Sequence, residues 1–194
     1  MLKQGCFAAL LAFALLCLSG CMGSIWTGAT MVYNRHNVYK KLDDYSLYIK
    51  VNNAIMVDNA FKNTESVIDI AIFNGDVLVA GHVPTAEMQM ELSQRLAKVR
   101  GYRRLFNQVK VSALESNTVQ DSWITTKIRS QIFADDSIDP NAFKIVTSDR
   151  VVYLMGDVRK EQAEKVINMA RRTNDVVRVV KILKYYTYQD NSVG

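Results

Sequence analysis

Asp121-Ser-Trp-Ile-Thr-Thr-Lys-Ile-Arg-Ser-Gln-Ile-Phe133 is the stretch of this sequence that decides the fold. Its isoleucines, Ile124, Ile128 and Ile132, recur at every fourth position. Because an α-helix turns by about 100° per residue, this spacing places them in one buried stripe. Asp121 has a side chain suited to an N-cap. The stretch therefore predicts a helix that begins near Asp121 and packs against a core.

The same helix carries a second face, which points away from the buried stripe. This face holds two aromatic side chains, two hydroxyls and two cations: Trp123, Thr126, Lys127, Arg129, Ser130 and Phe133. Large apolar side chains set among hydroxyls and cations are typical of a surface that contacts lipid headgroups. Exposed apolar patches also mark protein partners, so packing of Trp123 and Phe133 against another part of the protein is the alternative.

The first 20 residues have the pattern of a signal peptide. Lys3 supplies the positive charge, and residues 6–16 form an apolar run that is too short to span a bilayer. Leu18-Ser-Gly-Cys21 then matches a bacterial lipobox, in which the cysteine thiol carries the lipid. We therefore expect Cys21 to be lipidated with two or three acyl chains, since one chain anchors a protein only marginally. The alternative is an ordinary signal peptide followed by an accidental cysteine.

The rest of the composition fits an exported, membrane-associated protein. The three cysteines lie at positions 6, 17 and 21, so the processed chain is left without a disulfide and must rely on packed cores. The formal net charge of +5 suits an anionic partner. Because a lipoprotein does not normally meet nucleic acid, we expect acidic lipid and no nucleic acid. Met22, rather than an aspartate, follows Cys21, which favours the outer membrane.

The chain contains an internal repeat, in which Lys50 aligns with Lys127. Leu47, Val51 and Ile55 occupy the positions of the three isoleucines. Each copy continues with two β-rich runs joined by a turn, an amphipathic helix and a last β-rich run. These elements cover residues 67–73, 76–82, 86–99 and 105–111 in the first copy, and 143–147, 151–158, 160–172 and 176–188 in the second. The order α-β-β-α-β, found twice, predicts an α+β fold of two small domains.

These boundaries divide the chain into six parts. They are a lipoprotein signal peptide (1–20), a lipidated tether (21–43), a first domain (44–112), a linker (113–120), a second domain (121–188) and a C-terminal tail (189–194).

The repeat resembles a known family. A helix, a hairpin whose second strand ends in glycine, a second helix and a final strand that begins Val-x-x-Val are the pattern of the BON domain. Two such domains behind a lipobox resemble the dual BON-domain outer-membrane lipoproteins of Gram-negative bacteria. The runs 123–131 and 152–156 carry this resemblance most strongly. Asp175 departs from it, because family members often have glycine there, as the first copy has at Gly101.

The resemblance implies a fold and a function. Each domain is expected to be a three-stranded mixed sheet packed on two helices. The family protein is not an enzyme; it binds anionic phospholipid, phosphatidylglycerol above all, and supports outer-membrane integrity at division sites. It faces the periplasm and is associated with the outer-membrane β-barrel assembly machinery. The lipid-binding residues carried over are Trp123, Ile124, Thr126, Lys127, Arg129, Ser130 and Phe133. The alternative is a protein-interaction adaptor, for barrel assembly or the cell wall, that uses the same face.

Residues with the chemistry of a catalytic or metal site are scarce. The sequence has two histidines, His36 and His82, and neither an HExxH motif nor a Gly-rich phosphate loop. The pairs Asp43-Asp44 and Asp135-Asp136 are predicted at helix ends, where acids cap the helix or are solvated. We therefore expect no catalytic residue, no metal and no cofactor.

The two copies differ on the exposed face of their first helix. Ser46 takes the place of Trp123 and Asn52 takes the place of Arg129, although the first copy keeps Lys50. This comparison assigns membrane contact to the second domain, and scaffolding or partner contact to the first.

Overall fold

The structure is a computed structural model, and it describes residues 30–62, 65–113 and 117–186. The predicted signal peptide, Cys21 and the predicted tail lie outside these residues. The chain divides into two units between Val38 and Tyr39. Both copies of the repeat, apart from the start of the first helix, belong to the second unit.

The first repeat has five elements: α2 (Thr30–Ile55), β1 (Val67–Phe73), β2 (Asp76–Val83), α3 (Ala86–Leu96) and β3 (Arg104–Val111). β1 and β2 form an antiparallel hairpin, and β3 pairs with β2 in parallel after the crossover through α3. The hairpin turn is Asn74-Gly75, and both residues have positive φ, which this dipeptide adopts readily.

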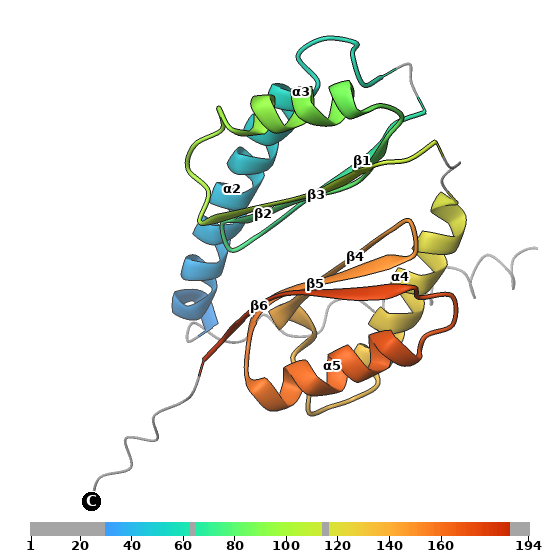
Figure 1. The fold of residues 1–194 in the computed structure, drawn as a ribbon. Coiled ribbons are helices and arrows are strands. Elements are labelled where there is room, and N and C mark those ends of the chain that lie inside the picture. The colour runs from blue at the N-terminus through green and yellow to red at the C-terminus, as the bar shows by residue number, and fades with distance from the viewer. Residues whose placement is uncertain (1–29, 63–64, 114–116, 187–194) are drawn as a thin grey trace, which may run out of the picture. The chain divides into compact units, whose positions relative to one another are not determined.

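The second repeat has the same order: α4 (Thr118–Phe133), β4 (Phe143–Ser148), β5 (Val151–Val158), α5 (Lys160–Arg172) and β6 (Arg178–Tyr185), with a short 3-10 turn, η2 (Pro140–Ala142), before β4. β4 pairs with β5 antiparallel and β6 with β5 parallel. In each repeat the two helices cover one face of the sheet (Figure 1). The predicted α+β fold, two three-stranded mixed sheets each packed on two helices, is confirmed.

Several predicted positions are wrong in detail. α4 begins at Thr118, and its N-cap is Asn117, whose side chain accepts a hydrogen bond from the backbone N–H of Gln120 at 3.0 Å. Asp121 is therefore inside the helix and is not its N-cap. Asp43-Asp44 also lies inside a helix, because α2 runs from Thr30 to Ile55.

Each repeat has its own core, built from the predicted stripes. Leu47, Val51 and Ile55 of α2 are buried in the first core, and the three isoleucines of α4 are buried in the second. The glycine near the end of each second strand allows a close backbone approach, as predicted. A Cβ added to Gly81 would lie 2.0 Å from the carbonyl oxygen of Val67.

A third core joins the two sheets on the faces that their helices leave free. It contains Ala71, Leu78, Ala80, Val151, Tyr153, Met155 and Ile182, all of them buried. The strands β2 and β5 are thus buried on both faces, which explains why their sequences are continuous apolar runs instead of alternating ones. The two repeats share this core and do not pack independently.

Candidate membrane-contact site

The exposed face of α4 is framed by two aromatic side chains. Trp123 and Phe133 each lie five residues from the buried Ile128, one on either side, and so stand about 140° around the helix from it. Trp123 is 46% exposed and Phe133 is 70% exposed. Neither aromatic is buried in a core of the described residues, so both are accessible on the surface that the structure describes.

The middle of this face is lined by Thr126 and Ser130, which are both exposed. The Ser130 hydroxyl donates to the carbonyl oxygen of Thr126 at 2.9 Å. Val119 lies one turn before Trp123 on the same face and is 79% exposed. Val119 was not predicted here, because the predicted helix began at Asp121; the run Thr118-Val-Gln, which continues the helix toward its N-terminus, was the available signal.

Lys127 and Arg129 are exposed on opposite flanks of the face. The Lys127 ammonium lies 4.8 Å from the centre of the Trp123 ring, which is within the range of a cation–π contact. This contact orients the indole while leaving the charge in water. Ile124 does not belong to this face: it is fully buried in the core, so its predicted place among the lipid-binding residues is wrong.

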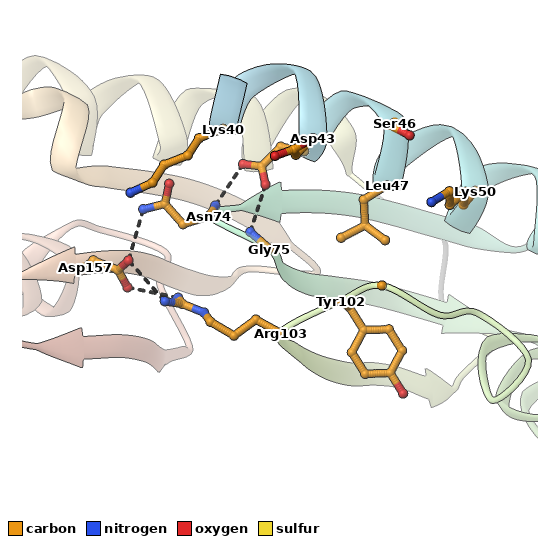
Figure 2. Close-up of a pocket in the computed structure, with 12 residues that line it drawn as sticks. Lys40, Asp43, Ser46, Leu47, Lys50, Asn74, Gly75, Tyr102, Arg103 and Asp157 are labelled. Carbon is orange, nitrogen blue, oxygen red and sulfur yellow. Dashed lines mark hydrogen bonds and ion pairs between the residues drawn. The ribbon is translucent and has the colours of Figure 1, made fainter. Parts of the chain in front are cut away.

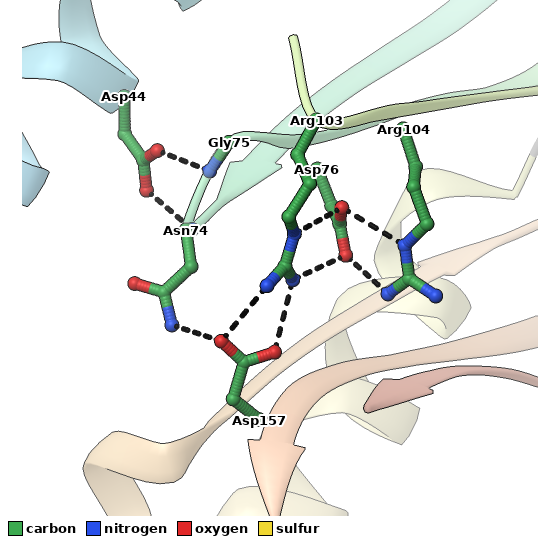
Figure 3. Close-up of polar contacts among 7 residues, drawn as sticks. All are labelled: Asp44, Asn74, Gly75, Asp76, Arg103, Arg104 and Asp157. Carbon is green, nitrogen blue, oxygen red and sulfur yellow. Dashed lines mark hydrogen bonds and ion pairs between the residues drawn. The ribbon is translucent and has the colours of Figure 1, made fainter. Parts of the chain in front are cut away.

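α4 is fixed to the rest of its repeat by Asp121. The Asp121 carboxylate accepts hydrogen bonds from the backbone N–H groups of Asp149 and Arg150 at the β4–β5 turn, each at 2.8 Å. Asp44 does the same for Asn74 and Gly75 in the first repeat, again at 2.8 Å (Figure 3). The carboxylates that were predicted to cap helices therefore clamp each helix to its hairpin.

The first repeat has a hollow beside the corresponding part of α2. It measures about 560 Å³, and its lining includes Ser46, Lys50 and Tyr102 (Figure 2). Ser46 and Lys50 correspond to Trp123 and Lys127, so the first repeat lacks the indole that covers this position in the second. Cations and carboxylates are balanced in the lining, which also includes Lys40, Asp43, Asp44, Arg103 and Asp157.

α2 nevertheless exposes apolar and aromatic side chains of its own: Tyr39, Leu42, Tyr45, Tyr48 and Ile49 are all at least 40% exposed. The comparison of the two copies by sequence did not predict this surface. It rested on the positions equivalent to Trp123 and Phe133, whereas the tyrosines of α2 lie at other positions.

Charged side chains connect the repeats at one end of the shared core. Arg103 donates to Asp76 at 2.7 Å and to Asp157 of the second repeat at 2.9 Å (Figure 3). Burial alone would raise the pKa of Asp76, but hydrogen bonds from Arg103 and Arg104 outweigh it and hold this pKa below its usual value. Asp76 is thus a stable, ionised link in the network.

The equivalent junction on the other side of the repeat pair is formed by His82 and Asp149. His82 is 1% exposed, and its Nδ1 lies 3.0 Å from both carboxylate oxygens of Asp149. Its Nε2 is buried without a hydrogen-bond partner among the described residues. His82 thus links the two repeats through Asp149. Within the described residues, no cluster of three or more His, Cys, Asp or Glu side chains is placed to hold a metal ion, and no helix is long and apolar enough to cross a membrane.

The sequence of this chain is similar to those of known proteins. A model of the BON domain matches residues 120–185, which cover the second repeat. The outer membrane lipoprotein DolP of Haemophilus influenzae is 30% identical over 184 residues, covering 91% of this chain and 94% of the relative. The chain belongs to the dual BON-domain outer-membrane lipoprotein family. A 21 kDa hemolysin of Actinobacillus pleuropneumoniae is 27% identical, covering 75% of each chain. The osmotically-inducible protein Y of Escherichia coli is 26% identical, covering 74% of this chain and 73% of the relative.

Within this family fold, the described α4 face belongs to the second BON domain. Its exposed members are Trp123, Thr126, Lys127, Arg129, Ser130 and Phe133, to which the structure adds Val119. The first BON domain carries the hollow at Ser46 and the tyrosine-rich side of α2.

Proposed function

We propose that this protein is a non-enzymatic lipoprotein that binds anionic phospholipid, phosphatidylglycerol above all, through α4 of its second BON domain. The observation that carries this proposal is the exposure of Trp123 and Phe133 on the side of α4 opposite its core. Leaving two large aromatics in water is unfavourable, and a lipid surface removes that cost. Tryptophan suits the headgroup region because its ring is apolar while its N–H can stay wet.

The charges around these aromatics support an anionic surface. Lys127 and Arg129 are exposed on the same face, and neither has a carboxylate within ion-pairing distance among the described residues. Each cation near an anionic membrane adds about 1 kcal/mol of attraction, which salt weakens. The α4 face therefore combines an apolar anchor with a charge preference.

The cellular setting is part of the same proposal. The lipobox at Cys21 and the similarity to the outer membrane lipoprotein of Haemophilus influenzae support an outer-membrane lipoprotein that is lipid-anchored and faces the periplasm. In this setting the protein would support outer-membrane integrity at division sites, with the β-barrel assembly machinery as a partner.

A second function, as a protein-interaction adaptor, is favoured by the first BON domain. α2 has an exposed apolar surface that is separate from the proposed lipid-binding face of α4 and is therefore free to contact a protein. Its residues are Tyr39, Leu42, Tyr45, Tyr48 and Ile49. In the adaptor function the α4 face with Trp123 would contact protein as well, whereas in the first function it contacts lipid.

Vesicle co-sedimentation of the full chain tests the proposal. Cys21→Ala is included in every variant so that no acyl anchor holds the protein on the vesicle. Trp123→Glu should abolish binding to phosphatidylglycerol vesicles, because it removes an apolar anchor and adds repulsion. Ser46→Glu, the matched change in the first BON domain, should have little effect.

Circular dichroism of both variants is the folding control, since neither position is buried. Undiminished binding by a folded Trp123→Glu protein would contradict lipid contact through α4 and favour the adaptor. Loss of binding in high salt, and weak binding to phosphatidylcholine vesicles, are expected of the unsubstituted chain.

A further inference from the structure

A pocket opens beside the α4 face, next to Phe133. It measures about 260 Å³, and its lining includes Phe73, Arg129, Ile132, Phe133, Phe143 and Lys144. The lining thus contains three phenylalanines and two cations. Phe133 and Arg129 belong to both the pocket and the exposed face of α4, so the pocket is reached directly from that face.

Lys144 is the unusual member of this lining. It lies on β4 and is partly buried, and its ammonium donates to the carbonyl oxygen of Ile72 at 3.2 Å. Burial lowers the pKa of Lys144; Asp44 acts in the opposite direction, and the like charge of Arg129 lowers the pKa further. A cation has therefore been moved out of water and placed near another cation.

These two cations are only partly compensated by the described side chains. Among the described residues, neither Lys144 nor Arg129 has a carboxylate within ion-pairing distance. Asp44 attracts Lys144 without forming an ion pair with it, and its two oxygens accept the backbone N–H groups of Asn74 and Gly75. A partly buried cation is normally paired, since leaving it unpaired is costly. A bound anion would remove that cost.

The walls of the pocket restrict what that anion is. A free inorganic anion has no use for Phe73, Phe133 and Phe143, whereas an amphiphile places its apolar part against such rings. At about 260 Å³ the pocket lies just below the range of about 300–1,000 Å³ that is usual for drug-sized ligands, so it is too small for a whole lipid and can take only part of one. Continuity with the α4 face places the remainder of the molecule at the membrane surface.

We propose that this pocket takes the phosphodiester headgroup of one anionic phospholipid between Lys144 and Arg129, with the start of an acyl chain against the phenylalanine rings. This inference rests on the proposed lipid binding by α4 and extends it. The face with Trp123 attaches the protein to a surface, and the pocket selects anionic over zwitterionic lipid by its charge. A choline group, being cationic, would meet two like charges there.

The first BON domain supplies an internal contrast. Lys144 pairs with Met155, the residue before the strand glycine, and the residue in the same register of the first domain is Asp69, which pairs with Ala80. Asn52 replaces Arg129. The equivalent position thus has a carboxylate instead of an ammonium, and that carboxylate is bound by the Ser148 hydroxyl at 2.6 Å. Anion binding at this register is therefore a property of the second domain.

The test compares lysine variants of the full chain, each with Cys21→Ala, in co-sedimentation with phosphatidylglycerol and phosphatidylcholine vesicles. Lys144→Gln should weaken binding to phosphatidylglycerol about fivefold, as expected for one lost cation, and leave binding to phosphatidylcholine unchanged. Arg129→Gln, an exposed position that leaves the core intact, should have a similar effect. Lys110→Gln is the matched control, because it removes an exposed lysine of β3 that does not line the pocket.

A second measurement identifies the ligand. Dihexanoyl-phosphatidylglycerol, added below its micelle concentration, should shift the NMR signals of the Lys144 ammonium-bearing carbon and of the Phe143 ring. It should also raise the pKa of Lys144, because a bound anion favours the charged form. Glycerol phosphate, which lacks acyl chains, should shift these signals far less.

The outcomes separate this inference from the function on which it rests. If Lys144→Gln binds phosphatidylglycerol vesicles as Lys110→Gln does, while Trp123→Glu fails to bind, the pocket is refuted and lipid binding by α4 stands. Should glycerol phosphate shift the Lys144 signal as strongly as the lipid, the pocket is a simple anion site and the lipid assignment is wrong. Equal binding of the unsubstituted chain to both vesicle types would overturn both proposals.

Discussion

The two BON domains have the same order of elements and the same strand pairing, yet they present different surfaces. In both, an aspartate on the first helix clamps the hairpin turn, and three aliphatic residues of that helix enter the core. On the outward side, the second domain has Trp123 and Arg129 where the first has Ser46 and Asn52. The two copies thus share the residues that build the fold and differ on the outward side of their first helix.

The largest expected effect comes from the core that the two domains share, where they should respond together instead of separately. Tyr153 is 1% exposed in the core between the sheets. Tyr153→Ala should destabilise both domains by about 3–5 kcal/mol, the usual cost of removing a buried aromatic ring. Ile128→Ala, in the core of the second domain alone, should cost about 2–5 kcal/mol and open that domain first.

Residue-level hydrogen exchange distinguishes the two variants. Faster exchange in both sheets of Tyr153→Ala, with the effect of Ile128→Ala concentrated in residues 118–185, would agree with a shared third core. If Tyr153→Ala left the first domain protected as before, the sheets would not be coupled.

A smaller effect on stability is expected from Asp69, which occupies in the first domain the register of Lys144 in the second. Burial raises the pKa of Asp69, the Ser148 hydroxyl lowers it, and the charges of Asp121 and Asp149 raise it further. Because this pKa is higher in the folded chain than in the unfolded one, stability falls as the pH rises from about 3.9 through the raised value. Asp69→Asn should therefore raise the melting temperature at pH 7.

The same variant and the unsubstituted chain should melt alike at pH 3, where Asp69 is protonated in both folded and unfolded chains. Melting curves at the two pH values check this. A melting temperature for Asp69→Asn that is lower than that of the unsubstituted chain at pH 7 would show that the ionised carboxylate stabilises the junction.

Much of the fold could be predicted from the sequence, because its signals are local. The repeated aliphatic spacing, the Asn74-Gly75 turn and the glycines at strand ends each determine an element or a close approach. The shared core was not predicted, although the continuous apolar runs of β2 and β5 indicated burial on both faces. The exposed face of α4 was predicted except for Val119, which depends on where the helix starts, and Ile124, which is buried in the core.

Lys144 could not be identified in this way. In the sequence it is one lysine among many, in a strand that begins Phe-Lys-Ile. Its significance comes from tertiary packing, which partly buries its side chain and brings it close to Arg129 and to the end of β1. The exposed tyrosines of α2 were not predicted either, because they do not lie at the positions equivalent to Trp123 and Phe133.

The central claim, that the α4 face enters anionic lipid, is tested most directly by the fluorescence of Trp123. The chain has two tryptophans, so Trp26→Phe makes Trp123 the single reporter, and Cys21→Ala removes the acyl anchor. With vesicles of phosphatidylglycerol that carry brominated acyl chains, we predict a blue shift and quenching of the Trp123 emission. Vesicles of brominated phosphatidylcholine should produce little of either. Emission that stays unshifted and unquenched, while the protein still sediments with phosphatidylglycerol vesicles, would contradict lipid entry by this face.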